Sequence, residues 1–114
     1  MALFTGKGDR GTTTAFGCNQ QRISKASERP EALGALDELN AFIGFVKMHA
    51  ADSPRIGGIL RETQENLFIV QAQTAGADKK LKDGTVEKVS EIVNEIEKEI
   101  PPVKGFSIAG GTEL

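Results

Sequence analysis

The clearest periodicity in the chain lies in residues 85–100, which read TVEKVSEIVNEIEKEI. The apolar residues recur at spacings of three and four, and they are Val86, Val89, Val93, Ile96 and Ile100. This spacing places them on one face of a helix, while glutamate and lysine occupy the other positions. Thr85 can cap the helix at its start, and Pro101 ends it because proline supplies no amide donor. The segment therefore predicts an amphipathic helix with one packed face.

Two more helices are predicted upstream of this one. Residues 30–50 carry leucine, isoleucine and valine at helical spacing, with Ser27 as a possible cap and Pro30 in the first turn. The turn at residues 52–54 precedes a second helix, predicted for residues 55–77. We therefore predict an all-α fold, an up-and-down helical bundle.

The predicted domain organisation is a single domain over residues 1–114. Residues 1–29 form a glycine-rich amino-terminal loop, and residues 30–114 form the helical bundle. Ala35, Phe42 and Phe45 widen the apolar surface of the first helix beyond one stripe. This width predicts that further helices or another subunit cover that helix.

Composition restricts the class of protein. A chain of 114 residues, 39% of them hydrophobic, is the size of one small domain. Its apolar runs are too short to cross a bilayer, so we expect a cytoplasmic protein without a membrane partner. The single cysteine, Cys18, and the single histidine, His49, do not provide a metal-ligand cluster. We expect Cys18 to be a small loop residue.

The first 29 residues differ from the remainder in charge. They hold five lysine and arginine residues against two acidic residues, whereas the whole chain has a net charge of −2. A basic, glycine-rich segment on an acidic protein favours a small anionic ligand over a nucleic-acid duplex, which needs a wider basic face. The alternative interpretation is a solvated, mobile tail.

Residues 5–14, which read TGKGDRGTTT, hold the groups that phosphate binding requires. Glycine lets the backbone approach phosphate oxygens, and the threonine hydroxyls, Lys7 and Arg10 add donors and charge. The spacing is not that of a Walker loop. Composition alone therefore leaves two possibilities open, a phosphate-binding loop and a flexible tail.

Four motifs along the chain resemble, in order, those of the PduO-type ATP:cob(I)alamin adenosyltransferases. The family's Tyr-Thr-Arg-Thr-Gly-Asp-x-Gly-Thr-Thr corresponds to FTGKGDRGTT at residues 4–13, and its Arg-Val-Ser-Lys to RISK at residues 22–25. Its Glu-Ala-x-Gly-x-x-Asp-Glu-Leu-Asn corresponds to EALGALDELN at residues 31–40. Its Phe-x-x-x-Gly-Gly corresponds to FSIAGG at residues 106–111.

The resemblance implies roles for residues at the matching positions. Asp37, at helical spacing from Asn40, would lie at a subunit boundary and make a salt bridge that orders the corrinoid site. Phe106 would displace the lower axial ligand of the corrinoid. These two residues are the predicted catalytic residues. The residues predicted to wrap the ATP triphosphate or otherwise contact ligand are Thr5, Gly6, Lys7, Gly8, Thr13, Thr14, Lys25 and Asn40.

The reaction implied by the resemblance transfers the 5′-deoxyadenosyl group of ATP to Co(I) of a corrinoid, with Mg²⁺ present. Cob(I)alamin and ATP would be the substrates, and the enzyme would be a homotrimer. Co(I) is a very strong nucleophile, so the protein need only align cobalt with the ribose C5′ and stabilise the leaving triphosphate.

Two departures from the family pattern bear on this interpretation. Gly6 and Lys7 stand where the family has a basic residue and a threonine, which moves a positive charge and removes a hydroxyl. The family's later arginine-bearing helix has no counterpart, and residues 112–114 read as the start of a helix. We therefore expect a fragment or a shortened relative. The alternatives are a non-catalytic carrier or sensor that binds ATP or a corrinoid, and a purely structural bundle.

Overall fold

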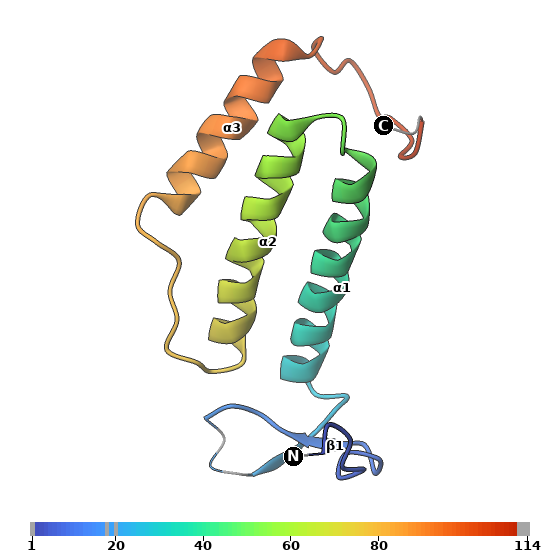
Figure 1. The fold of residues 1–114 in the computed structure, drawn as a ribbon, viewed down its shortest axis with the longest axis vertical. Coiled ribbons are helices and arrows are strands. Elements are labelled where there is room, and N and C mark those ends of the chain that lie inside the picture. Colours follow the sequence, from blue (N-terminus) through green and yellow to red (C-terminus); the bar gives the residue numbers. More distant parts are fainter. Residues whose placement is uncertain (1, 18, 20, 112–114) are drawn as a thin grey trace. The chain divides into compact units, whose positions relative to one another are not determined.

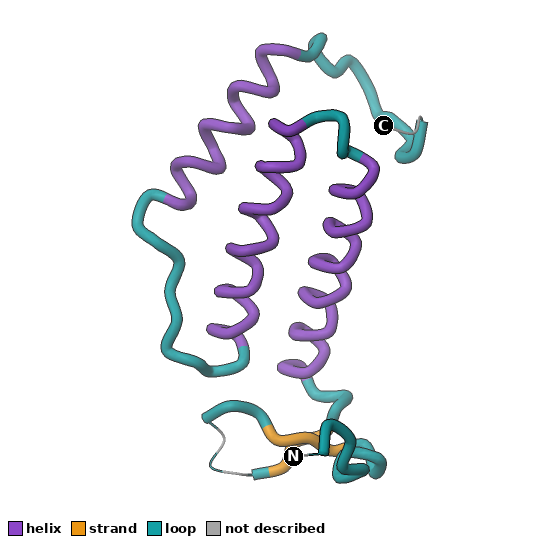
Figure 2. The backbone as a smooth tube through the Cα atoms, in the orientation of Figure 1, coloured by secondary structure: helices purple, strands orange, loops and turns teal. Residues whose placement is uncertain are grey.

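The computed structural model describes residues 2–17, 19 and 21–111. Cys18 and the helix start expected at residues 112–114 therefore lie outside the described residues. The described part of the chain is mainly helical, with α1 at Glu28–His49, α2 at Pro54–Thr74 and α3 at Thr85–Glu99 (Figure 2). The chain forms two compact units, Met1–Lys80 and Leu81–Leu114.

In the first unit, α1 and α2 pack against each other as an antiparallel helical hairpin (Figure 1). The connection is short, and the Ser53 amide donates a hydrogen bond of 3.0 Å to the Ala50 carbonyl within it. Most of the apolar residues of both helices at the predicted positions are half-buried, among them Ile43 on α1 and Leu67 on α2. The helical spacing in the sequence therefore reflects packing between these two helices.

The helix starts follow from where the nearby hydroxyl groups bond. Ser27 occupies the N-cap position of α1, but its hydroxyl donates to the Ser24 carbonyl and makes no cap bond. Helix α1 therefore begins at Glu28, two residues before the predicted start, with acidic Glu28 and Glu31 in its first turn. Acidic side chains in the first turn stabilise a helix because they interact favourably with the positive end of its dipole.

The prediction of Thr85 as the cap of the third helix was wrong by one residue. Gly84, with φ of +82°, holds the N-cap position of α3, and Thr85 is already helical. The reason is local, because the Thr85 hydroxyl donates to the Lys82 carbonyl at 2.7 Å and so closes the preceding turn. In the second unit, α3 carries its apolar residues on one face as expected, but Val86, Val89 and Val93 on that face are exposed. The predicted packed face is therefore not packed within this unit, because α3 is the only helix among the unit's described residues.

The prediction that residues 1–29 are entirely loop was also wrong in part. Thr12–Thr14 forms β1 and Arg22–Ser24 forms β2, and the two strands pair antiparallel with Thr13 opposite Ile23. Each strand has only three residues, too few for a periodic pattern to stand out among the glycines. The small sheet lies at the end of the hairpin where α1 begins and α2 ends (Figure 1).

Much of the apolar surface remains exposed. Among the described residues, only Ala50 and Asn40 are buried. On α1, Leu39, Phe42, Phe45 and Met48 are all exposed, and the rings of Phe42 and Phe45 lie 6.1 Å apart. None of the helices in the described part is long and apolar enough to span a membrane.

Candidate functional site

The glycine-rich loop is folded into consecutive turns by its own backbone. The Asp9 amide donates to the Gly6 carbonyl, and the Gly11 amide donates to the Gly8 carbonyl, both at 3.1 Å. Gly6 has φ of +67°, a backbone conformation that glycine adopts without steric cost. The predicted triphosphate loop, Thr5–Gly8, is therefore folded into a turn and is not an extended tail.

Lys25 lies directly over this turn. Its ammonium nitrogen is 2.9 Å from where a Cβ on residue 8 would stand, so a larger residue there would displace the end of the lysine side chain. Its backbone amide also donates to the Gly11 carbonyl at 2.9 Å. The structure thus brings together Lys25 and Gly8, two residues that the resemblance assigned to the same ligand.

Arg22 is a functional candidate to which the sequence motifs assigned no role. Its Nη2 donates to the Lys7 and Thr12 carbonyls, both at 2.7 Å, and its Nε donates to the Thr12 hydroxyl at 2.8 Å. The guanidinium thus joins the turn to both strands. An arginine within a glycine- and threonine-rich segment is the signal that could have pointed to this role, since guanidinium has several donors in a fixed geometry.

The three threonines of β1 do not share one face of the sheet. Successive side chains of a strand point to opposite faces, so Thr13 lies opposite Thr12 and Thr14. Thr13 is half-buried and pairs with half-buried Ile23, whereas Thr14 is exposed and pairs with Arg22. The predicted pair Thr13 and Thr14 therefore presents hydroxyls on two faces.

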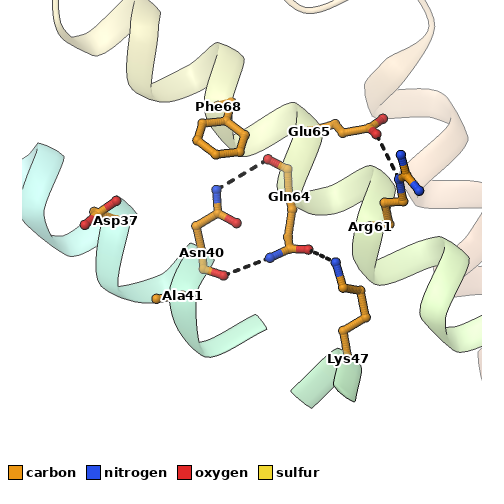
Figure 3. Close-up of a pocket in the computed structure, with 8 residues that line it drawn as sticks. All are labelled: Asp37, Asn40, Ala41, Lys47, Arg61, Gln64, Glu65 and Phe68. Atoms are coloured by element: carbon orange, nitrogen blue, oxygen red, sulfur yellow. Dashed lines mark hydrogen bonds and ion pairs between the residues drawn. The ribbon is translucent and has the colours of Figure 1, made fainter. Parts of the chain in front are cut away.

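A second candidate region is a pocket of about 500 Å³ along α1 and α2 (Figure 3). It contains two predicted site residues, Asp37 and Asn40. The complete lining consists of Asp37, Asn40, Ala41, Lys47, Arg61, Gln64, Glu65 and Phe68. The pocket thus combines two acids, two cations, two amides and one aromatic ring, a lining suited to a polar ligand or to an ion-pairing side chain.

Asn40 on α1 forms hydrogen bonds with Gln64 on α2. It is 6% exposed, its side-chain amide lies 3.5 Å from the Gln64 carbonyl, and Gln64 Nε2 donates to the Asn40 carbonyl at 3.1 Å. Lys47 Nζ then donates to Gln64 Oε1 at 2.6 Å (Figure 3). Buried amides are stable when bonded in this way. The side chain of Asn40 therefore joins α1 to α2.

The two predicted catalytic residues are both exposed. Asp37 lies on α1 at the pocket, and no ion pair of its carboxylate is found among the described residues. The ion pair within the pocket is Arg61 with Glu65, 3.2 Å apart on α2. Phe106 belongs to the second unit, where its side chain is fully exposed.

Comparison with known proteins identifies the class to which this loop and pocket belong. Residues 3–114 match the sequence model of the Cobalamin adenosyltransferase family, so the chain belongs to that family. It is 31% identical to "Corrinoid adenosyltransferase PduO" of Citrobacter freundii over 99% of this chain, and 31% identical to "Corrinoid adenosyltransferase" of Bacillus subtilis over the same share.

A solved structure supports the same family. The chain superposes with a TM-score of 0.83 and 28% identity on a variant of the PduO-type ATP:corrinoid adenosyltransferase from Lactobacillus reuteri, complexed with cobalamin and ATP. The match covers 98% of this chain and 65% of that one. The chain spans 35% of the Citrobacter protein and 61% of the Bacillus protein.

Proposed function

We propose that this protein transfers the 5′-deoxyadenosyl group of ATP to Co(I) of a corrinoid and releases triphosphate. The main support for the proposal is the placement of the Lys25 ammonium next to Gly8 in a hydrogen-bonded turn. A cation beside a glycine-rich backbone turn is an arrangement that suits a polyphosphate. Membership of the Cobalamin adenosyltransferase family supports the same conclusion.

The loop would bind and orient the nucleotide. Charge on the leaving triphosphate is stabilised by preorganised donors, and here Arg22 holds the turn through bonds to Lys7 and Thr12. Lys7 and Lys25 would then supply positive charge without a large rearrangement of the loop. The cobalt is itself the nucleophile, so the chain's own task is alignment with C5′.

Mg²⁺ would be held mainly by the triphosphate. The described residues contain no group of three or more histidine, cysteine, aspartate and glutamate side chains that could hold a metal ion by themselves. Magnesium in nucleotide sites usually takes one or two protein ligands with substrate phosphates and waters. The Asp9 carboxylate, next to Gly6 in the turn, fits that need. When bound, the ion would neutralise charge on the leaving group.

On the corrinoid side, we propose that Asp37 accepts a salt bridge from a cation outside the described residues. Asn40, one turn later on α1, would act as a positioning residue, because its contact with Gln64 holds this part of α1 against α2.

Phe106 would displace the lower axial ligand of the corrinoid, because an aromatic ring occupies the position of that ligand without donating electrons to cobalt. Phe106→Ala should then leave ATP affinity unchanged and reduce four-coordinate cob(II)alamin. Identical absorption spectra for both forms would argue against this role.

We further propose a homotrimer in the cytoplasm, in which α1 is covered by another subunit and the helices complete a closed bundle. The exposed residues Leu39, Phe42, Phe45 and Met48 on α1 support an interface, since such clusters usually mark one. Light scattering at micromolar concentration tests the assembly, and a monomer for the complete protein would contradict it.

The activity itself is tested by direct assay. Cobalamin is reduced to Co(I), Mg-ATP is added with the protein, and adenosylcobalamin is followed by absorption. Binding of ATP and cob(II)alamin with no turnover above the rate without protein would favour a carrier or sensor. Binding of neither would leave a structural helical protein.

A further inference from the structure

Gly76 terminates α2 in a specific hydrogen-bonded turn. The Ala77 amide donates to the Ala72 carbonyl at 2.9 Å, and the Gly76 amide donates to the Gln73 carbonyl at 3.0 Å. This pair of bonds defines a Schellman motif, in which the residue at the position of Gly76 takes a positive φ. Here φ is +102°. Glycine is usual at this position, and asparagine is also found there.

The same glycine is in backbone contact with the loop. A Cβ on residue 76 would lie 2.7 Å from the carbonyl oxygen of Phe16 and 3.6 Å from its carbonyl carbon. Real Cβ atoms essentially never approach backbone so closely. A Cβ on residue 17 would in turn lie 3.8 Å from the Gly76 carbonyl oxygen, an ordinary van der Waals distance. The chain at residues 16–17 therefore rests directly against the end of α2.

This contact lies two residues after β1. Strand β1 pairs with β2, and β2 carries the Arg22 guanidinium that bonds the Lys7 carbonyl. Phe16 is therefore connected through the strand pair and the Arg22 bond to the turn beneath Lys25. The loop's covalent attachment to the hairpin is at the start of α1, so the contact at Gly76 provides a second point of attachment.

We propose that Gly76 is a positioning residue for nucleotide binding, because the absence of a side chain there lets the loop dock on the end of α2. The proposal rests on the proposed function in that the loop's ligand is ATP. Apparent affinity falls in proportion to the fraction of protein in the binding-competent state. A loop that is prevented from docking should therefore bind ATP more weakly while the helices persist.

The test uses Gly76→Asn with Gly84→Asn as the matched control. Asparagine tolerates positive φ and suits the Schellman position, but its Cβ would still meet Phe16. Gly84 has a similar φ of +82° and no atom within 4 Å of a Cβ. If the fraction of docked loop falls to about a tenth, the Kd for Mg-ATP should rise about tenfold in Gly76→Asn. The Kd should change little in Gly84→Asn. The Kd for cob(II)alamin should stay the same in both.

Hydrogen exchange without ligand separates this inference from the proposed function. The amides of Asp9, Gly11 and Lys25, bonded within the loop, should exchange faster in Gly76→Asn than in the unaltered protein or in Gly84→Asn. Equal exchange in all three would overturn the inference, whether or not ATP binds. Equal loss of ATP affinity in both variants would overturn it too, as would loss of helical circular dichroism in Gly76→Asn. Failure of the unaltered protein to bind ATP, with faster exchange in Gly76→Asn, would overturn only the proposed function.

Discussion

The glycine-rich loop and the α1–α2 hairpin belong to the same compact unit but are held by different forces. In the loop, a single guanidinium, Arg22, makes three hydrogen bonds to exposed backbone and hydroxyl groups. The hairpin combines half-buried apolar side chains of α1 and α2 with one buried amide, Asn40. The loop's order therefore depends on few polar bonds that ligand could reinforce, whereas the hairpin's order depends on burial. Substitutions should separate ligand binding in one from stability in the other.

The largest expected effect is on turnover, and it tests whether the cations within residues 1–114 are sufficient for the reaction. Three phosphate groups need several convergent cations, and the described loop supplies Lys7, Lys25 and Arg10 beside an Arg22 already bonded to backbone. Removal of one preorganised donor from an active site typically lowers the reaction rate a hundredfold or more. A polypeptide of residues 1–114 alone should therefore adenosylate Co(I) at least about a hundredfold more slowly than a full-length relative. Comparable rates by absorption would show that the loop and hairpin suffice.

The next largest expected effect is on ATP affinity, and it tests the role of Lys25. Lys25→Ala should raise the Kd for Mg-ATP by roughly 10- to 100-fold, since hydrogen bonds to charged groups contribute about 1.5–3 kcal/mol. Calorimetry measures the affinity, and circular dichroism should show unchanged helical content. Lys98→Ala, which removes an exposed lysine from α3, is the control and should leave the Kd unchanged. Equal affinity in the two variants would remove Lys25 from the site.

In the hairpin, by contrast, a substitution should lower stability and leave ATP affinity nearly unchanged. Asn40→Ala removes a buried amide from its contact with Gln64, so the free energy of unfolding should fall by about 1–3 kcal/mol. ATP affinity should change little. Denaturant titration measures the stability, with Asn94→Ala on an exposed position of α3 as the control. A large loss of ligand affinity with unchanged stability would instead support direct ligand contact by Asn40.

The smallest effect concerns the ion pair in the pocket. Arg61 and Glu65 are exposed by 75% and 62%, so their mutual attraction is weak in water. Arg61→Ala should lower stability by less than about 0.5 kcal/mol. The same denaturant titration measures it. Should corrinoid affinity fall in this variant while stability holds, Arg61 would be assigned to the ligand rather than to the hairpin.

The sequence predicted the helices well because helical periodicity is a local property. The apolar spacing in residues 85–100 corresponds to α3, and the spacing in residues 30–50 corresponds to α1. The helix ends were predicted less accurately, as at Thr85, because a threonine hydroxyl at a helix start can bond either a helix amide or a carbonyl of the preceding turn. The two short strands were missed, since three residues are too few to show an alternating pattern.

By itself, the sequence determined the chemistry of the loop, the helical elements and, through its ordered motifs, the family. Only the tertiary structure showed that Arg22 holds Lys7, that Asn40 faces Gln64 and that Phe16 rests on Gly76. These pairs lie far apart along the chain, Arg22 and Lys7 by 15 residues and Asn40 and Gln64 by 24. Residue type and spacing specify which groups can bond, but the packing of α1 on α2 and the return of the loop to the end of α2 decide which groups meet.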